Sequence, residues 1–371
     1  MFILVINCGS SSAKYQLFDT NGYRSLAKGI VERIGQTVDC PDHYAAVRRI
    51  VDALTDRRRG VIRSKDEIDG IGHRVVHGGE EFKRSTLITR EVIKSVERYS
   101  ELAPLHNPPS LFGIRACFDI LKGVPQVAVF DTSFHQTMPE KAFLYGLPFR
   151  YYKNFKIRRY GFHGTSHRYV REAAAKKLKL PLNRLKLITC HLGNGCSMTA
   201  VNGGKSVDTS MGFTPLEGLL MGTRSGDLDP AAVLYIIEKE KVSLNRINDI
   251  LNKESGLLGI SGSSNDMRDL VQEAKGKGQR AKKAKLAIEM FIYRIEKYIG
   301  AYQAAMGSLD AVVFTAGIGE NHPWLVKRIA NDLKGVVSRK ARFLVIPTNE
   351  ELLIAKDTYR LIQKFKIKIQ N

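Results

Sequence analysis

Two segments of the chain, 182 residues apart, repeat the pattern of an apolar strand followed by a glycine-rich turn. The first strand is Phe2–Ile6, and its turn is Cys8-Gly9-Ser10-Ser11-Ser12, after which apolar and polar residues alternate. The second strand is Leu185–Leu192, and its turn contains Gly193-Asn194-Gly195. Apolar runs joined by such turns predict β-hairpins. A chain that contains this pattern twice is expected to contain two related domains.

A second pair of strands recurs at nearly the same offset. Val127–Thr132 resembles Val312–Gly317, 185 residues later, because each is an apolar run that ends in a polar turn. Helical periodicity separates the strands in four segments, 89–102, 165–180, 229–240 and 282–306. Such alternation predicts a layered α/β protein. At 371 residues the chain is longer than one hydrophobic core usually covers, and we expect two domains, 1–150 and 151–371. The last helix is expected to pack back on the N-terminal domain.

Composition excludes several classes of protein. Met1–Ile6 is apolar, but no basic residue precedes it, and no stretch approaches the roughly 18 apolar residues of a membrane span. The five cysteines form no CxxC pair, and an odd number does not suit a disulfide framework. We therefore expect a cytoplasmic protein with reduced thiols and no membrane partner.

The charge is strongly positive. The chain has 58 lysine and arginine residues against 37 aspartate and glutamate residues, a net charge of +21. This excess suggests an anionic partner, either a substrate or a macromolecule. Residues 150–186 alone contain twelve basic residues against one acidic residue. However, no recognised DNA-binding or RNA-binding module is present, which disfavours nucleic acid and leaves a solvated basic surface as the interpretation of most of the excess.

The two glycine turns have the composition of anion-binding turns. Asn7–Lys14 concentrates small residues, hydroxyl groups and one lysine, so that backbone N–H groups can approach an anion closely. The chain has no P-loop spacing, and the turn that starts at Gly317 has His322 where a dinucleotide fingerprint needs a third glycine. Two such turns at the heads of two related domains would hold a polyphosphate from both sides.

Two histidine pairs, His73 with His77 and His163 with His167, have the i, i+4 spacing of a helical zinc site. Neither pair contains the catalytic glutamate of the HExxH motif, which disfavours zinc. The Val-Val and Gly-Thr residues between the histidines also argue against helices. Loops that present imidazoles and an arginine to an anion suit these residues better.

Two proline-containing loops offer further candidates. His106 lies in a loop stiffened by Pro104 and Pro108, where a lone histidine is more often structural or exposed than catalytic. Arg224 lies between glycines, where it has little to pack against, and we interpret it as an anion-binding residue. Asp229, followed by a proline, is interpreted as a helix N-cap.

Together, the motifs resemble the acetokinase family of the actin, sugar-kinase and heat-shock ATPase superfamily. The resemblance runs from Phe2 to about Ala355 and rests on ordered motifs: NCGSSSAKYQLFD, GHRVVHGGE, LAPLHNPP, FDTSFHQTMP, RYGFHGTSH, CHLGNGCSMTAV with GFTPLEGLLMGTRSGDLDP, and FTAGIGEN with IPTNEE. It implies two duplicated actin-like (ribonuclease H-like) α/β domains with a cleft between them. It also implies reversible, direct in-line transfer of the ATP γ-phosphoryl group to acetate, giving acetyl phosphate and ADP.

The resemblance also implies a role for each motif residue. Arg74 would bind the acetate carboxylate, Arg224 and His163 would stabilise the migrating phosphoryl group, and Asp131 would orient the site. The acetate pocket would contain Val76, Leu105, His106 and Pro215. The nucleotide would contact Ser10, Ser12, Lys14, His191, Asn194, Gly195, Asp266, Arg268, Gly317, Ile318 and Asn321. The metal, Mg²⁺ with Mn²⁺ as a substitute, would be held by Asn7 and Glu350.

Four further expectations accompany the resemblance. The acceptor is already ionised at neutral pH, so no strong general base is needed. Propionate or another short-chain fatty acid is an alternative acceptor, because a pocket discriminates weakly against one extra methylene. A non-catalytic ATP-binding protein is an alternative of another class, and the presence of both Arg74 and Arg224 argues against it. The family also implies a homodimer, although this chain is shorter than the family pattern after Val31 and between Asn321 and Ile346.

Overall fold

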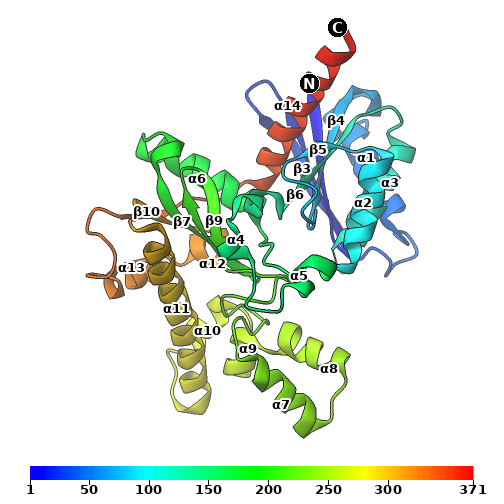
Figure 1. Ribbon diagram of the computed structural model, residues 1–371. Helices are drawn as coiled ribbons and strands as arrows, with labels where there is room; N and C mark the ends of the chain where they lie inside the picture. Colours follow the sequence, from blue (N-terminus) through cyan, green and yellow to red (C-terminus); the bar gives the residue numbers. More distant parts are fainter. Residues whose placement is uncertain (105, 371) are drawn as a thin grey trace. The chain divides into compact units, whose positions relative to one another are not determined.

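The computed structural model describes residues 1–104 and 106–370, and the chain divides into two compact units (Figure 1). Unit 1 comprises Met1–Gln136 and Asn349–Asn371, and unit 2 comprises Thr137–Thr348. Each unit contains its own β-sheet. The boundaries that the sequence predicts for the two related domains, 1–150 and 151–371, stay a prediction.

Unit 1 is built on a six-stranded sheet in the order β3-β2-β1-β4-β6-β5. Its strands are β1 (Phe2–Cys8), β2 (Ser12–Asp19), β3 (Arg24–Glu32), β4 (Ile68–Val75), β5 (Thr86–Leu87) and β6 (Gln126–Phe130). Its helices are α1 (His43–Thr55), α2 (Arg90–Arg98), α3 (Asn107–Ile120) and α14 (Glu350–Gln370), with 3₁₀ turns η1 (Lys65–Glu67), η2 (Tyr99–Glu101) and η3 (Ser133–Thr137). β1 is antiparallel to β2 and parallel to β4, and β4 is parallel to β6.

The side chains of β1 alternate between two apolar layers, as a strand buried on both faces requires. Ile3 and Val5 pack in one cluster with residues of α14, and Leu4 and Ile6 pack in another with residues of α1 and α3. A side chain at Gly70 of β4 would overlap α14, so this glycine permits the close approach of the helix. The C-terminal helix therefore completes the core of unit 1.

Unit 2 contains a five-stranded sheet in the order β11-β10-β7-β8-β9. Its strands are β7 (Lys186–Leu192), β8 (Cys196–Asn202), β9 (Lys205–Thr209), β10 (Ala311–Thr315) and β11 (Arg342–Val345). Its helices are α4 (Glu140–Phe143), α5 (Arg150–Phe155), α6 (Gly164–Leu178), α7 (Pro230–Glu240), α8 (Leu244–Asp249), α9 (Gly256–Ser261), α10 (Met267–Glu273), α11 (Gly278–Met306), α12 (Ala316–Asn321) and α13 (Pro323–Asp332), with short turns η4 (Leu182–Arg184) and η5 (Ile250–Glu254). α6 packs against β7 and β10, and α11 packs against β7 and β8. None of the helices in the described part of the chain is long and apolar enough to cross a membrane.

The topology confirms one predicted repeat and corrects the other. Both hairpins form, because β1 pairs with β2 and β7 pairs with β8. However, β10, which contains Val312, is parallel to β7 in the position that β4 occupies beside β1. β6, which contains Val127, corresponds instead to β11. The predicted equivalence of 127–132 with 312–317 is wrong, because buried parallel strands share an apolar pattern that does not reveal their place in the sheet.

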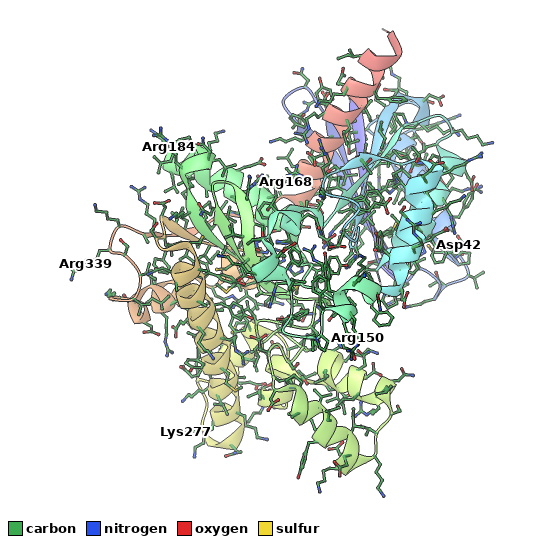
Figure 2. All side chains as sticks on the ribbon, in the orientation of Figure 1. Asp42, Arg150, Arg168, Arg184, Lys277 and Arg339 are labelled. Atoms are coloured by element: carbon green, nitrogen blue, oxygen red, sulfur yellow. The ribbon has the colours of Figure 1, made fainter. Side chains whose placement is uncertain are left out.

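The surface charge is concentrated in unit 2. Within Thr137–Thr348 there are 34 lysine and arginine residues against 18 aspartate and glutamate residues, a net charge of +16 out of the total of +21. Figure 2 shows Arg184, Lys277 and Arg339 extending away from the ribbon of this unit. These three side chains lie outside the motif residues, which agrees with a solvated basic surface.

All five cysteines are free and buried. Burial raises the pKa of Cys8 and of Cys196 to about 12. Because the thiolate is the reactive form, we expect the native protein to react negligibly with DTNB near neutral pH, and all five thiols to react once guanidinium unfolds it. Rapid modification of Cys8 in the native protein would contradict this prediction, and would indicate that the first glycine turn opens in solution.

Candidate active site

In unit 1, the first glycine turn lies at the same end of the sheet as Arg74. The turn is closed by a hydrogen bond from the Gly9 N–H to the Ser12 carbonyl oxygen, at 2.7 Å. Asn7 pairs in register with Lys14 across the hairpin. On its other side, the parallel register of β1 with β4 brings Asn7 next to Arg74. Four predicted residues of unit 1, Ser12 included, thus lie at one edge of the sheet.

Arg74, Asp131 and Glu350 form an ion cluster at this edge. Nη2 of Arg74 donates to Oδ2 of Asp131 at 2.5 Å, and its Nε lies 3.1 Å from the same oxygen. The Nε atom also lies 3.6 Å from Oε2 of Glu350. The Asp131 side chain is only 1% exposed. The cluster joins the ends of β4 and β6 to the start of α14, and it holds two carboxylates against one guanidinium.

This excess of negative charge changes the titration of the cluster. Burial, with the charges of Asp131 and Glu351, raises the pKa of Glu350 to about 7 against the opposing effects of Arg74 and Lys14. Burial would lower the pKa of Arg74, but Asp131 and Glu350 hold it above its ordinary value. A divalent cation would relieve the repulsion between the carboxylates, so this oxygen-donor set suits Mg²⁺. Within residues 1–104 and 106–370 no group of three or more His, Cys, Asp or Glu side chains could hold a metal by itself, so water and substrate would complete the ligands.

The shifted Glu350 predicts how stability depends on pH. Because the folded state binds this proton more tightly than the unfolded state, whose pKa is 4.5, the stabilisation is full below that pH and is lost as the pH rises through about 7. We measure unfolding by urea without Mg²⁺. As the pH rises from 4.5 to about 7, we expect the free energy of unfolding of a Glu350→Gln variant to increase by on the order of 2 kcal/mol relative to that of the native protein. Glu32→Gln, at an exposed glutamate of unit 1, is the control. An identical pH dependence in the native protein and the Glu350→Gln variant would contradict the assignment.

In unit 2, His163 and Arg224 converge on the second glycine turn. A Cβ atom placed on Gly195 would lie 3.5 Å from Nη1 of Arg224 and 3.5 Å from Cε1 of His163. The His163 ring stacks on His191, with ring centroids 4.2 Å apart. Three predicted residues, His163, His191 and Arg224, therefore surround the predicted turn. The absence of a side chain on Gly195 keeps this space open.

His163 has a positive φ of 55°, which is uncommon for a residue other than glycine, and it is the N-cap of α6. The prediction that Gly164 and Thr165 prevent a helix here is wrong. A helix begins immediately at Gly164, because the first N–H groups of a helix need no partner within it and a weak helix former costs little there. Backbone strain at His163 is typical of residues held in place at functional sites.

Arg224 lies in the loop between β9 and α7, as expected, and is a half-buried cation. Its Nη1 donates to the carbonyl oxygen of Pro215 at 3.2 Å. Burial lowers the pKa of Arg224, and no acidic side chain of the described residues forms an ion pair with it. The loop is fixed on α11 by Asp227, whose Oδ2 accepts from the Tyr298 hydroxyl at 2.8 Å. A rigidly held arginine without a carboxylate partner is a site for an anion. The predicted N-cap is confirmed, since Asp229 accepts from the Ala231 N–H at 2.9 Å.

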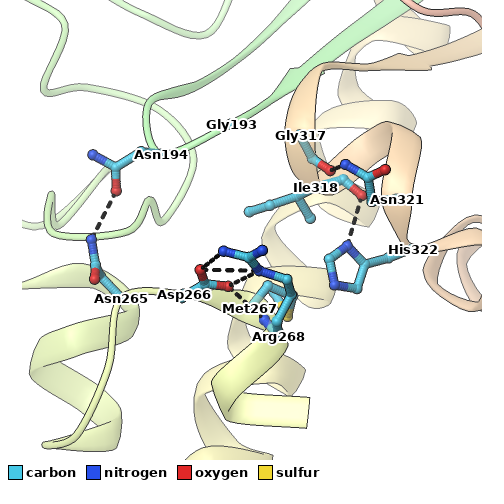
Figure 3. Close-up of a pocket in the computed structure, with 10 residues that line it drawn as sticks. All are labelled: Gly193, Asn194, Asn265, Asp266, Met267, Arg268, Gly317, Ile318, Asn321 and His322. Atoms are coloured by element: carbon cyan, nitrogen blue, oxygen red, sulfur yellow. Dashed lines mark hydrogen bonds and ion pairs between the residues drawn. The ribbon is translucent and has the colours of Figure 1, made fainter. Parts of the chain in front are cut away.

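A cavity of 690 Å³ in unit 2 contains the predicted nucleotide residues of this unit other than His191 and Gly195 (Figure 3). It is lined by Gly193, Asn194, Asn265, Asp266, Met267, Arg268, Gly317, Ile318, Asn321 and His322. Arg268 folds back on Asp266, donating from Nη2 to Oδ2 at 2.6 Å. Nδ2 of Asn265, in the segment before α10, donates to Oδ1 of Asn194 at 3.1 Å and so connects that segment to the glycine turn. Gly193 belongs to the predicted glycine turn, whereas sequence reasoning missed Asn265, Met267 and His322 as lining residues, although each adjoins a predicted residue.

The segment predicted as a turn at Gly317 is the short helix α12. Its first residue, Ala316, has a φ of 64°, and its N–H donates to Oε1 of Glu320 at 2.7 Å. The same carboxylate oxygen accepts from the Thr348 N–H at 3.2 Å. Glu320 thus connects the start of α12 to the segment that follows β11, a role that sequence reasoning did not assign.

The predicted acetate residues belong to both units. In unit 1, Val76 and His106 lie in adjacent segments, because Asn107 bonds both the N–H and the carbonyl group of His77, each at 3.0 Å. Pro215 lies in unit 2 beside Arg224. Leu105 lies outside the described residues. Ser10 is exposed on the first turn.

The model of the acetokinase family matches residues 2–337. The chain belongs to the acetokinase family. It is 52% identical to the acetate kinase of Halothermothrix orenii over 400 aligned positions, which cover 98% of this chain and 100% of that protein. Since the alignment is longer than the 371 residues of the chain, this acetokinase carries deletions relative to that relative.

Solved structures of the acetokinase family agree with the fold. The crystal structure of Porphyromonas gingivalis acetate kinase has a TM-score of 0.92 at 42% identity, covering 97% of this chain and 99% of that one. A propionate kinase from Francisella tularensis has a TM-score of 0.89, also at 42% identity, with coverage of 97% and 99%. The predicted fold class, an actin-like α/β protein with two domains, is confirmed.

Proposed function

We propose that this acetokinase is an acetate kinase, which transfers the γ-phosphoryl group of ATP to acetate and gives acetyl phosphate and ADP. The observation that carries the proposal is Arg224, a half-buried cation with no acidic partner among the described residues, beside His163 and Gly195. A phosphoryl group in transfer spreads negative charge over its equatorial oxygens, and such donors stabilise it. Family membership supports the same activity.

The acetate site is assigned to unit 1. Arg74 offers a planar fork of donors that matches a carboxylate, and its bonds to Asp131 fix the orientation of that fork. Val76, Leu105 and Pro215 would border the methyl group of acetate. His106, in a segment next to Val76, would assist in binding the substrate. Because acetate is already ionised, these residues have only to position it against another anion.

The nucleotide site is assigned to unit 2. A cavity of 690 Å³ lies in the range of small-molecule and cofactor sites. No atom lies within 4 Å of a Cβ placed on Gly317, which leaves room for an adenosine and favours ATP over pyrophosphate as the donor. Asp266, Arg268, Ile318 and Asn321 would contact the nucleoside. His191, Asn194 and Gly195 in this unit, with Ser10, Ser12 and Lys14, would contact the phosphates.

Mg²⁺ is assigned to Glu350 and Asn7, with Asp131 supporting the site. When bound, the ion would neutralise charge on the ATP phosphates. Mn²⁺ would substitute, because it also prefers oxygen ligands. The residues of the chain orient this site through Arg74, which bonds Asp131 and lies close to Glu350.

The transfer itself needs no strong base. The acetate oxygen attacks the γ-phosphorus in line with the leaving ADP oxygen, and one P–O bond forms as the other breaks. Arg224 and His163 hold the equatorial oxygens throughout, so that they stabilise the transition state more than the ground state. The reverse reaction uses the same contacts.

A second acceptor is favoured by one specific observation, the similarity to a propionate kinase. One methylene changes binding by about 1–3 kcal/mol, so acetate and propionate would differ in degree. A hydroxamate assay with ATP, Mg²⁺ and acetate, propionate or butyrate tests both proposals, and we expect the highest kcat/KM with acetate. A higher value for propionate would replace the first proposal by the second. ATP binding without any hydroxamate would indicate a non-catalytic nucleotide-binding protein.

We also propose that the protein is cytoplasmic and forms a homodimer. An exposed apolar helix, α7, supports the dimer. None of the residues of α7 is buried, and Leu234 and Tyr235 are 69% and 60% exposed. An exposed apolar stripe of this kind is typical of an interface. Light scattering is expected to give about 83 kDa, twice the 41.5 kDa of one chain, and the Leu234→Glu, Tyr235→Glu double variant is expected to be a monomer. Val38→Glu, at an exposed apolar residue of unit 1, is the control, and a double variant that remains a dimer would reject this surface.

A further inference from the structure

In unit 2, one tyrosine joins the two ends of the segment 213–217, which contains Pro215. The Tyr145 oxygen accepts from the Phe213 N–H at 2.9 Å. Its hydroxyl donates to Oε2 of Glu217, since an ionised carboxylate has no proton to give. Burial and the neighbouring Glu217 raise the pKa of Tyr145, so the hydroxyl keeps its proton at neutral pH. The start and the end of the segment are therefore held by the same side chain.

Arg159 binds the other oxygen of Glu217. Its Nη2 donates to Oε1 of Glu217 at 2.5 Å, and its Nη1 donates to the carbonyl oxygens of Thr209 and Ser210 at 2.7 and 3.1 Å. The side chains of Arg159 and Glu217 are 18% and 30% exposed, so solvent and salt screen this ion pair less than a surface pair. The pair thus fixes the end of the segment to the end of β9.

Gly212 makes room for this arrangement. A Cβ atom placed on Gly212 would overlap both Oε2 of Glu217 and the Tyr145 hydroxyl oxygen. The Gly212 carbonyl oxygen accepts from the N–H groups of residues 160 and 161, at 3.0 and 3.3 Å. These residues directly precede Phe162 and the N-cap of α6. The glycine therefore lets the two side chains meet and ties them to the segment that leads into α6.

The same segment contains the carbonyl group to which Arg224 is bonded. Nη1 of Arg224 donates to the Pro215 oxygen at 3.2 Å. Pro215 lies midway between Phe213 and Glu217, the two positions that Tyr145 holds. A shift of the segment would move this acceptor and, with it, the plane of the guanidinium. The mechanism proposed above gives Glu217 no role of its own.

We propose that Tyr145, Arg159 and Glu217 are positioning residues, together called the Glu217 clamp, which direct the Arg224 guanidinium at the migrating phosphoryl group. The inference rests on the proposed function, because it takes Arg224 as the cation that stabilises this group. The clamp acts through the Pro215 carbonyl group. The nucleotide cavity is lined by other residues, so the clamp affects kcat rather than the binding of ATP or ADP.

Glu217→Gln tests the clamp directly. Glutamine has nearly the same shape, but it presents an NH₂ group to one of the two donors, Arg159 or Tyr145. We expect hydroxamate kinetics to give a kcat lowered by about 10–100-fold, with the KM for ATP and for acetate within about twofold of the native values. The affinity for ADP, measured by isothermal titration, is also expected to stay within about twofold. An unchanged kcat, or a loss of ADP affinity as large as the loss of rate, would overturn the proposal.

Glu254 provides a matched control for this substitution. It also lies in unit 2 and pairs with an arginine, Arg246, but both side chains of this pair are nearly half exposed. Glu254→Gln is expected to leave kcat within about twofold of the native value, since a surface ion pair contributes little. An equal loss of kcat in Glu254→Gln would show that the effect is not specific to the clamp and would overturn the proposal.

A double-mutant cycle separates the positioning of Arg224 from a general effect on the fold. In an Arg224→Ala background the clamp has no guanidinium to position, so we expect Glu217→Gln to lower kcat there by less than about twofold. Tyr145→Phe keeps the ring, removes the hydroxyl and is expected to behave in the same way, and it replaces Glu217→Gln in the cycle if that variant does not fold. An equal loss of kcat with and without Arg224 would overturn the proposal.

A failure of the proposed function gives a different result. Without acyl phosphate from the native protein and any short-chain acid, the proposed function is rejected, and the role of the clamp with it. Full activity of a folded Arg224→Ala variant would reject the assignment of Arg224 to the phosphoryl group. A native protein that forms acyl phosphate at a rate that neither Glu217→Gln nor Tyr145→Phe changes would reject the clamp alone.

Discussion

Replacing Arg224 with lysine is expected to lower kcat by about 1,000-fold while the protein stays folded. Lysine keeps the charge but loses the planar fork, which in this loop is held by the bond of Nη1 to the Pro215 carbonyl. The loss should appear in kcat more than in the KM for acetate, because Arg224 is assigned to the phosphoryl group in transfer. Steady-state hydroxamate kinetics with ATP and acetate measure both constants.

Arg246 provides a matched control for this substitution. It also lies in unit 2, but it is exposed and pairs with Glu254. Arg246→Lys is expected to leave kcat within about twofold of the native value, since a surface ion pair contributes little. A kcat of Arg224→Lys equal to that of the control would show that Arg224 does not contact the reacting group.

Replacing Arg74 with alanine is expected to lower kcat/KM for acetate by about 1,000-fold and also to destabilise unit 1 by about 3–5 kcal/mol. Two effects combine, because Arg74 is assigned to the acetate carboxylate and is also the cation that offsets Asp131 and Glu350. Removing it takes away the guanidinium that forms an ion pair with the nearly fully buried Asp131. Urea unfolding and hydroxamate kinetics on the same preparation measure the two losses separately.

The double variant Arg74→Ala, Asp131→Ala separates the two effects. Because the buried carboxylate that paired with Arg74 is removed as well, much of the lost stability is expected to return, whereas acetate binding is not. Arg98→Ala, which breaks an exposed ion pair with Glu81 in the same unit, is the control for both measurements. Full activity of a folded Arg74→Ala variant would refute the assignment of the acetate site.

Local features of the fold could be predicted from the sequence because their causes are local. The hairpins at Gly9 and Gly195 follow from apolar runs joined by small residues, and both form. The cap at Asp229 follows from an aspartate before a proline, and it also forms. At these positions a few neighbouring residues determine the backbone.

The wrong strand equivalence concerns a feature that residues distant in the sequence determine. The strand that contains Val312 has the same apolar pattern as the strand that contains Val127, and only hydrogen bonding to β7 or to β4 reveals which position each occupies. The start of α6 at Gly164 was misjudged for a different reason, because a weak helix former costs little in the first turn of a helix, whose N–H groups need no partner within it.

The candidate site could be listed from the sequence but not assembled from it. Arg74, Asp131 and Glu350 come from segments far apart in the chain, and no spacing rule predicts that they form one cluster. The family motifs identified them as candidates, and the ends of β4, β6 and α14 bring them together. The contacts of His163 and His167 with the Ser197 hydroxyl had only one sequence signal, the second histidine of HGTSH.

Phosphorus-31 NMR of the purified protein with ATP, Mg²⁺ and acetate tests the central claim most directly. Direct transfer predicts that the ATP γ-phosphorus signal is replaced by the signal of acetyl phosphate as ADP accumulates, and that the reaction stops without acetate. The Arg224→Lys variant should give the same product far more slowly. Release of inorganic phosphate at the same rate with and without acetate, and no acyl phosphate with any short-chain acid, would contradict the account.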